Sequence, residues 1–188
     1  TMNKLVDIVD DSSWEEFMPS GVTKEMFKSF IKYYDPEIFV AAGRRIRTTV
    51  LSADELSPTE RVKKIAQLFA CFKNPDKETV LTPWRVVNMH MSDCLGGYDF
   101  YDEAHEQMVD DPRFVDRGKV TAETFANADA RVLEINSKTG LYPLYVTYSI
   151  FRSRCAACSE EELDDVKLQQ LWDTTVQENV FVICKTPM

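Results

Sequence analysis

The clearest architectural signal in this sequence is Val132-Leu133-Glu134-Ile135-Asn136-Ser137-Lys138-Thr139-Gly140. It begins as a short apolar run bounded by turn-forming residues, which indicates a buried strand. A carboxylate, Glu134, lies in that run, and small or polar residues then lead to a segment, 141–153, that we expect to be a helix. Doubly wound α/β folds bind nucleoside-like ligands at such strand–loop–helix junctions. The sequence therefore predicts an α/β region with a ligand-binding loop after this strand.

Two common phosphate-binding motifs do not fit this loop. A P-loop needs glycine directly before its Lys-Thr pair and again five residues earlier, but those positions hold Ser137 and Val132. A dinucleotide-binding fingerprint needs three spaced glycines, and here only Gly140 is present. The residues therefore argue against a P-loop and against NAD binding.

Three further elements belong to the predicted α/β region. The apolar run 179–184 indicates a second buried strand. Ser159-Glu160-Glu161-Glu162 has the form of a capping box that starts a helix. Upstream, Val80-Leu81-Thr82-Pro83-Trp84 predicts a helix that runs to Cys94, with its threonine as N-cap and its proline in the first turn.

The polar stretch 98–130 shows little periodicity, so we expect it to be irregular apart from a short helix at 121–127. Its acidic residues between 99 and 111 lack the glycine and regular spacing of a calcium loop, which favours a solvated face. Within it, Asp111-Pro112-Arg113-Phe114 is typical of a turn.

The N-terminal part of the sequence reads as a succession of helices. Ser13-Trp14-Glu15-Glu16 and Ser57-Pro58-Thr59-Glu60 both have the capping-box form. Apolar residues recur every three or four positions over 23–34 and 36–50, which is the spacing of an amphipathic helix. The turn-forming residues around Asn74-Pro75 are expected to close this region.

These elements predict a fold that is mainly α, then α/β. We expect a helical N-terminal region over residues 1–78 and an α/β region over residues 79–188. Two strands make an incomplete doubly wound sheet. We therefore expect the second region to continue beyond this chain.

Composition places the chain among ordinary globular proteins. Of its 188 residues, 44% are hydrophobic and 28% charged, which excludes disordered and low-complexity classes. Its net charge of -9 repels phosphate backbones, so a nucleic-acid substrate needs contacts from elsewhere. No apolar run approaches the roughly 18 to 20 residues of a membrane span.

The cysteines and histidines give no metal or nucleophile signature. Five unevenly spaced cysteines indicate reduced thiols and a cytoplasmic location. Cys155 and Cys158 have CxxC spacing, but with no second pair nearby we expect two buried thiols rather than a redox or zinc site. His90 lies on the helix that ends at Cys94, where we expect it to pack or to form a hydrogen bond.

Two motifs resemble a known family. Val80-Leu81-Thr82-Pro83-Trp84, with Val87 and Met91 behind it, resembles the Thr-Pro motif of gamma-type adenine-N6 DNA methyltransferases of restriction-modification systems. The stretch Leu133 to Gly140 resembles their first S-adenosylmethionine motif, and the two motifs occur in the family's order. The resemblance covers roughly residues 78–185. It implies an incomplete Rossmann-like methyltransferase domain and S-adenosylmethionine as the cofactor.

The resemblance also implies roles for individual residues. Thr82 and Pro83 would border the methionine end of the cofactor, and Glu134 would meet its amino group directly or through water. The loop beneath the cofactor would be formed by Asn136, Ser137 and Gly140. No metal is implied. DNA would be bound by parts of the parent enzyme outside this chain, with a restriction or specificity subunit as a further partner.

The sequence also departs from this family. Ile135 replaces a proline, Lys138 takes the place of the first glycine, and the second strand ends in Cys184-Lys185 instead of an acid that would bind ribose. The family's catalytic tetrapeptide, Asn or Asp-Pro-Pro-Tyr or Phe, is absent from the sequence. We therefore expect no catalytic residue and no methyltransferase activity in the isolated chain, although the parent protein would be an adenine-specific DNA methyltransferase.

A non-catalytic helical protein-interaction module is the alternative. The two hypotheses differ in where they place Thr82 and Glu134. Cofactor binding requires these residues to lie within one ligand's length of each other, whereas opposite faces would favour the interaction module.

Overall fold

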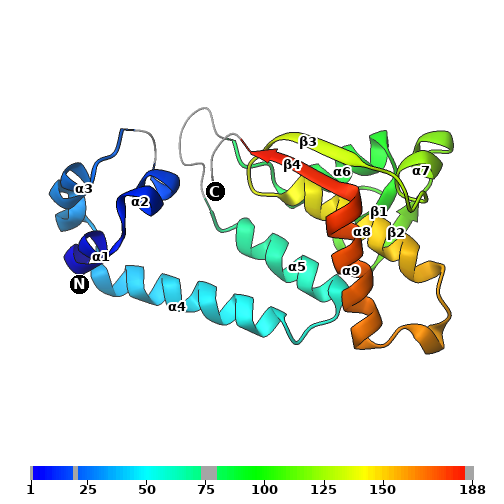
Figure 1. Ribbon diagram of the computed structural model, residues 1–188, viewed down its shortest axis with the longest axis horizontal. Coiled ribbons are helices and arrows are strands. Elements are labelled where there is room, and N and C mark those ends of the chain that lie inside the picture. Colours follow the sequence, from blue (N-terminus) through cyan, green and yellow to red (C-terminus); the bar gives the residue numbers. More distant parts are fainter. Residues whose placement is uncertain (1, 19–20, 73–79, 185–188) are drawn as a thin grey trace. The chain divides into compact units, whose positions relative to one another are not determined.

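The computed structural model describes residues 2–18, 21–72 and 80–184 (Figure 1). These residues form two compact units, a helical one within 2–72 and a mixed one within 80–184. The expectation of a mainly α, then α/β chain is thereby confirmed. The expected boundary at residue 78 and the expected turn at Asn74-Pro75 lie outside the described residues.

The described part of the N-terminal unit is helical. Its elements are α1 (Met2–Ile8), α2 (Asp11–Phe17), α3 (Lys24–Phe30), the 3₁₀ helix η1 (Ile31–Tyr33), α4 (Pro36–Ala53) and α5 (Pro58–Phe69). Ser57 caps α5 as predicted, since its side chain accepts the amide of Glu60 at 3.3 Å. Asp35 caps α4 in the same way, through the amide of Glu37 at 2.8 Å.

The prediction that Ser13 caps a helix is wrong. Asp10 caps α2, because its Oδ1 accepts a hydrogen bond from the backbone amide of Ser13 at 2.9 Å. The Ser13 hydroxyl donates to the other carboxylate oxygen of Asp10 at 2.8 Å. The carboxylate of Asp10, three residues before Ser13, therefore accepts the capping hydrogen bond, and the helix begins at Asp11.

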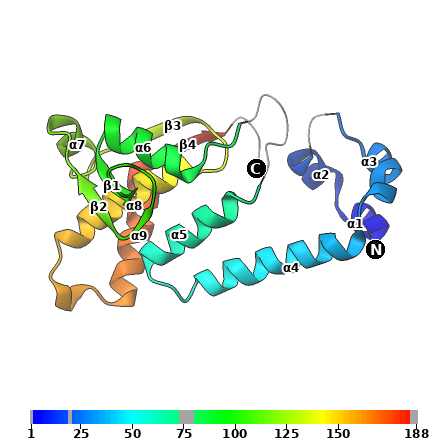
Figure 2. The same cartoon turned by 180° about the vertical axis from the view of Figure 1, so that it is seen from behind.

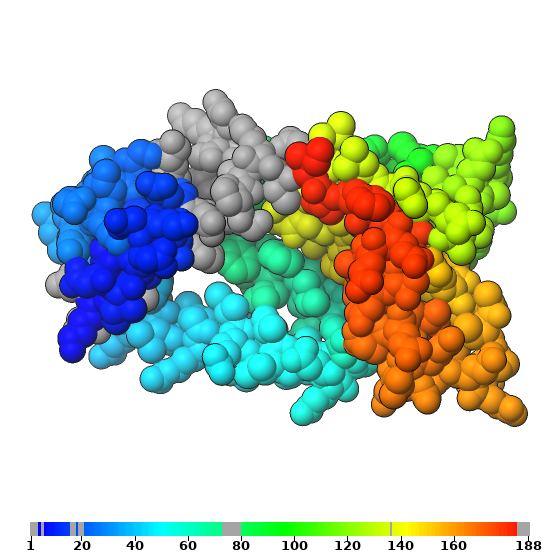
Figure 3. Space-filling view, viewed as in Figure 1, coloured from blue at the N-terminus to red at the C-terminus, as the bar shows by residue number. Residues whose placement is uncertain are grey.

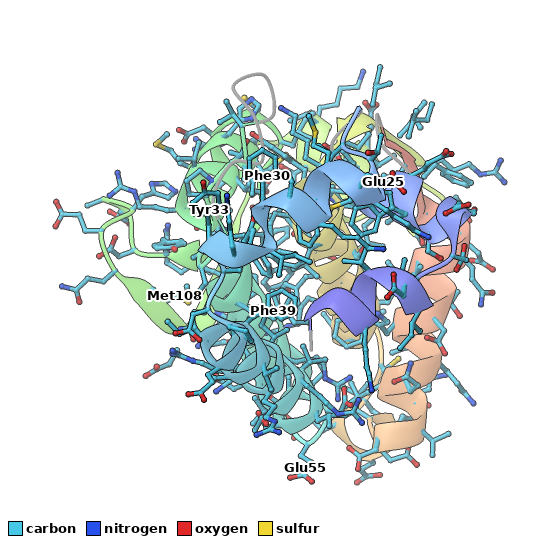
Figure 4. The ribbon with its side chains drawn as sticks, turned by 90° about the vertical axis from the view of Figure 1, so that its left-hand side faces the viewer. Glu25, Phe30, Tyr33, Phe39, Glu55 and Met108 are labelled. Carbon is cyan, nitrogen blue, oxygen red and sulfur yellow. The ribbon has the colours of Figure 1, made fainter. Side chains whose placement is uncertain are left out.

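Aromatic side chains remain exposed on the N-terminal unit. Figure 4 shows Phe30, Tyr33 and Phe39 on the consecutive elements α3, η1 and α4, and their exposed fractions are 48%, 73% and 46%. The arginines of α4 at 44, 45 and 47 are exposed as well.

The C-terminal unit combines helices with two small sheets. Its elements are α6 (Trp84–Cys94), β1 (Gly97–Tyr101), β2 (Met108–Val115), α7 (Lys119–Thr124), β3 (Val132–Ser137), α8 (Leu141–Ala156), the 3₁₀ helix η2 (Glu160–Glu162), α9 (Asp165–Asn179) and β4 (Val180–Cys184). Both predicted strands are present, as β3 and β4, but the prediction that they are buried is wrong, because Leu133, Ile135 and Phe181 are exposed. The predicted helix at 141–153 is present as the longer α8.

The helix expected after Ser159 begins later. Ser159 and Glu162 do form a capping box, but it closes only the single turn η2. A second cap then starts α9, where the Asp164 side chain accepts the amide of Lys167 at 2.7 Å. The region therefore contains two helix starts in place of the single one predicted.

The expectation that 98–130 is irregular is wrong, because β1 and β2 pair as an antiparallel hairpin within it (Figure 2). The segment 111–114, expected as a turn, lies inside β2. Asp99 and Arg113 are register partners across the two strands, and Arg113 Nη2 lies 3.3 Å from Asp99 Oδ2. Because Arg113 pairs with it, the charged Asp99 can occupy a buried position of β1. The sequence of this strand therefore lacks the alternation of apolar and polar residues by which a strand is recognised.

Helix α8 is the centre of the C-terminal unit. It contacts α6, α9, β1, β3 and β4, and it is buried on most sides. The Phe100 ring of β1 packs against Tyr148 of α8 at 4.6 Å and against Trp84 of α6 at 5.2 Å, measured between ring centroids. This aromatic core fixes α8 relative to α6 and the hairpin.

The second sheet consists of the parallel pair β3 and β4, and the chain passes through α8, η2 and α9 between them. Leu133 pairs with Phe181 and Ile135 with Ile183 in the register. These four side chains are 42% to 71% exposed, and β4 is visible in red on the surface (Figure 3). One face of the parallel pair is therefore apolar and open, whereas parallel sheets are usually covered on both faces.

No helix in the part of the chain that the structure describes combines the length and the apolar character needed to cross a membrane.

Candidate ligand-binding site

A cavity of about 190 Å³ lies in the C-terminal unit where β3 turns into α8. Its walls come from two parts of the sequence: Thr82, two residues before the start of α6, and residues between Glu134 in β3 and Tyr142 in α8. The lining residues are Thr82, Glu134, Ser137, Lys138, Thr139, Gly140, Leu141 and Tyr142. The cavity therefore gathers both motifs that the sequence singles out.

Backbone geometry shapes the β3–α8 junction. The pairing with β4 shifts between Ile135 and Ser137, so Asn136 is an extra residue in β3. Gly140 then adopts φ +74° as the N-cap of α8. A side chain at this position would meet nothing within 4 Å, so glycine is needed here for its backbone conformation and not for space.

Thr82 lines the cavity and does not cap the helix. Helix α6 begins at Trp84 with Pro83 at the N-cap, and no side chain caps it. The carbonyl of Pro83 accepts the amides of Val86 and Val87 at 3.0 and 3.1 Å. The predicted N-cap role of Thr82 is therefore wrong, because the helix starts one residue later than predicted.

Glu134 supplies a partly buried carboxylate. Its Oε2 atom is buried and has no hydrogen-bond partner. Burial raises the pKa of Glu134, and the nearby Ser137 hydroxyl lowers the pKa by a smaller amount. A buried acceptor without a hydrogen-bond partner is costly. A ligand group that donates a hydrogen bond or carries positive charge would therefore stabilise this carboxylate.

Tyr142 is held at the cavity by His90. The tyrosine hydroxyl lies 3.0 Å from His90 Nδ1, and the two rings are perpendicular at a centroid distance of 5.7 Å. Burial raises the pKa of the Tyr142 phenol, and the charges of Glu134 and Cys94 add to this effect. Tyr142 therefore remains a neutral hydroxyl at physiological pH. The expectation that His90 packs or forms a hydrogen bond is confirmed.

The structure brings together four of the six residues named from the sequence. Thr82, Glu134, Ser137 and Gly140 line one cavity. Pro83 is exposed and is not among the lining residues of the described chain. The backbone of Asn136 belongs to β3, but its side chain lies outside the described residues.

Four other lining residues were missed by the sequence reasoning. Lys138 and Thr139 belong to the same loop, and Leu141 and Tyr142 form the first turn of α8. Tyr142 falls within the aromatic series of the helix, where it reads as a core residue. Its place two residues after the loop glycine, in the first turn of the helix, was the signal that could have identified it.

A second polar cluster joins α6 to the hairpin. The buried Asp99 accepts from Arg113 and lies 2.9 Å from Nε2 of His105 through its Oδ2 atom. Ser92 Oγ lies 3.3 Å from the same His105 nitrogen. A serine–histidine–carboxylate relay needs two different ring nitrogens, so this cluster is a structural link. The expectation of a solvated acidic face is wrong for Asp99, because its pairs allow it to be buried.

The CxxC residues lie near the end of α8. Cys155 is buried and Cys158 is half-buried, and both are free thiols. Burial raises the pKa of Cys155, which makes its thiol unreactive. The described residues contain no group of three or more metal-ligating side chains.

The size and polarity of the cavity limit what it can hold. Pockets for drug-sized ligands measure roughly 300–1,000 Å³, so a cavity of about 190 Å³ has room for a small ligand or for one end of a larger one. Its wall offers a carboxylate, an ammonium group and several hydroxyls, among them those of Thr82, Ser137 and Thr139. This set suits a small polar group better than an apolar one.

Comparisons of the chain with protein-family models, with curated proteins and with solved structures each found no match.

Proposed function

We propose that this chain binds S-adenosylmethionine as the N-terminal part of an adenine-N6 DNA methyltransferase of a restriction-modification system. The supporting observation is that Thr82 and Glu134 line one cavity, although they lie far apart in the sequence. The two motifs that resemble the family meet at this place. The pairing of β3 with β4 and the turn into α8 agree with half of a Rossmann-like domain.

The residues of the cavity fit the methionine end of this cofactor. The carboxylate of Glu134 would accept from the ammonium group, which would provide the missing partner of Oε2. The hydroxyls of Thr82 and Ser137 offer further hydrogen bonds. The adenosine end would extend beyond the cavity, toward residues supplied by other parts of the parent enzyme.

The cofactor supplies a methyl group activated on its sulfonium. The contribution of this chain is to bind and orient it, so that the methyl group points along the line of displacement. Residues outside this chain would hold the flipped adenine and bind DNA. We propose no catalytic residue here, and we expect no methyl transfer to DNA by the isolated chain.

Calorimetric titration with S-adenosylmethionine tests this proposal. We expect the purified chain to bind, and Thr82→Ala and Glu134→Ala each to weaken binding by about 1–3 kcal/mol, the cost of leaving polar partners unpaired. Glu123→Ala is the matched control, because Glu123 is an exposed residue of α7. The proposal fails if the folded wild type does not bind, or if the control weakens binding as much as the two site variants.

The alternative is a non-catalytic helical protein-interaction module. The observation in its favour is the exposed apolar surface, on Leu133, Ile135, Phe181 and Ile183 of the parallel pair. Large exposed apolar patches mark interaction sites. A folded chain that does not bind S-adenosylmethionine would move the assignment to this alternative.

A further inference from the structure

Two opposite charges line the cavity without pairing. Glu134 and Lys138 are both lining residues, yet no ion pair joins them, although both side chains belong to the described part of the chain. The carboxylate of Glu134 and the ammonium group of Lys138 are therefore both available to a ligand that carries the two opposite charges.

We propose that Lys138 binds the α-carboxylate of the cofactor's methionine group, while Glu134 faces its ammonium group. The site thereby selects a zwitterionic amino-acid end. This inference rests on the proposed function, and it assigns a role to Lys138, one of the residues at which the chain departs from the family it resembles.

The ammonium group of Lys138 has donors to spare. Its Nζ lies 3.3 Å from the carbonyl oxygen of Val80, which is longer than the roughly 2.7–3.2 Å of a good hydrogen bond. An ammonium group has three donors. This contact joins Lys138, in the loop after β3, to Val80, in the segment before α6. The remaining donors of the ammonium group can bind a carboxylate.

The start of α8 favours an anion in the same place. Gly140 is its N-cap and Leu141 and Tyr142 are its first residues; all three line the cavity, and no side-chain hydrogen bond caps the helix. Free amides and the positive end of the helix dipole both stabilise negative charge at a helix N-terminus. Lys138 precedes this end by two residues, so both features attract a carboxylate to one side of the cavity.

The backbone permits a lysine at this position. Among the described non-glycine residues, positive φ is found at His105 alone. Lys138 therefore has an ordinary negative φ, and its place in the loop does not need glycine. A long charged side chain can occupy it without backbone strain.

The test compares S-adenosylmethionine with decarboxylated S-adenosylmethionine, which lacks only the α-carboxylate. By calorimetry we expect the wild-type chain to prefer the carboxylated ligand by about 10- to 100-fold, the range for a hydrogen bond to a charged group. Lys138→Met should lose this preference, because the variant should bind S-adenosylmethionine more weakly and decarboxylated S-adenosylmethionine as well as the wild type does. Lys138→Arg should keep most of it, and Lys119→Met, at an exposed lysine of α7, should change nothing.

The outcomes separate this inference from the proposed function. If the wild type binds both ligands equally, or if Lys138→Met weakens both to the same extent, the role of Lys138 is overturned while cofactor binding stands. If the folded wild type binds neither ligand, the proposed function fails together with this inference. Circular dichroism spectra identical to wild type confirm that each variant is folded.

Discussion

The hydroxyl oxygen of Tyr142 lies 3.0 Å from Nδ1 of His90, and this contact joins the first turn of α8 to α6 beside the cavity. The link is a side-chain hydrogen bond between residues 52 positions apart. It keeps one wall of the cavity in place without using the backbone.

This link should be measurable as a coupling energy. Tyr142→Phe and His90→Leu each remove the hydrogen bond, so the double variant should be less destabilised than the sum of the two by about 0.5–1.5 kcal/mol. Urea unfolding of the four proteins in the cycle measures this coupling. Additive effects would show that the contact contributes nothing to stability.

Gly140 and Gly97 should respond differently to alanine, although both have positive φ. At Gly140 an added Cβ meets nothing within 4 Å, so only backbone strain of about 1–2 kcal/mol is expected. At Gly97 the Cβ would lie 2.7 Å from Ser149 Oγ and 2.9 Å from a Phe125 ring carbon. We expect that overpacking to add about 1–3 kcal/mol to the strain.

Gly118→Ala tests the effect of backbone conformation without overpacking. Its added Cβ also meets nothing within 4 Å, but Gly118 has φ +70° and ψ -129°, outside the left-handed helical region in which Gly140 lies at φ +74° and ψ +11°. Denaturant unfolding should therefore give a larger loss for Gly118→Ala than for Gly140→Ala. Equal losses for Gly97→Ala and Gly140→Ala would contradict the packing around Gly97.

Asp99 should be among the most sensitive charged positions. Its side chain is fully buried and is paired with both Arg113 and His105. Asp99→Asn keeps the shape but leaves the Arg113 guanidinium without its anion and removes the carboxylate that faces His105, which should cost about 3–5 kcal/mol. Thermal or urea unfolding measures the loss. Glu123→Gln breaks an exposed pair with Lys119 and should change stability by less than about 0.5 kcal/mol.

Glu134 should make the ligand-free protein less stable as pH rises. Burial raises its pKa above the ordinary 4.5, so the folded state disfavours the ionised carboxylate. The stability from Glu134 is then fully present below its unfolded pKa and is lost as pH rises through its higher folded pKa. The free energy of unfolding, measured with urea from pH 4 upward, should therefore decline less steeply for Glu134→Gln than for the wild type.

Glu162 provides a control of opposite sign. The amide and hydroxyl of Ser159 lower the pKa of Glu162, so its contribution is present above its unfolded pKa and is lost as pH falls. Glu162→Gln should therefore alter only the acid side of the profile. A Glu134→Gln profile parallel to wild type would contradict the buried environment of that carboxylate.

Local patterns predicted those elements whose signals are local. The apolar runs of β3 and β4 and the Ser57 cap of α5 depend on neighbouring residues alone, and all are present. The hairpin of β1 and β2 was missed because the inward charge of Asp99 is balanced by Arg113, a residue on the other strand. Such a pairing has no local signature.

The candidate site shows the same division. Glu134, Ser137 and Gly140 follow one another on a strand and loop, so the sequence predicted that they share a site. The inclusion of Thr82 came from the order of two motifs in a resembling family. The position of Tyr142 in the first turn after the loop indicated that it could reach the site, but its hydrogen bond to His90 joins two helices and has no local signature.

The parallel pairing of β3 with β4 also has a kinetic consequence. Val132 pairs with Val180, so two helices must form and dock before the strands can meet. Contacts between such distant residues are formed late and slow the folding of a domain. Glu134 and Ser137 lie on β3 and line the cavity, so the cavity should become ordered during refolding only after β3 has paired with β4.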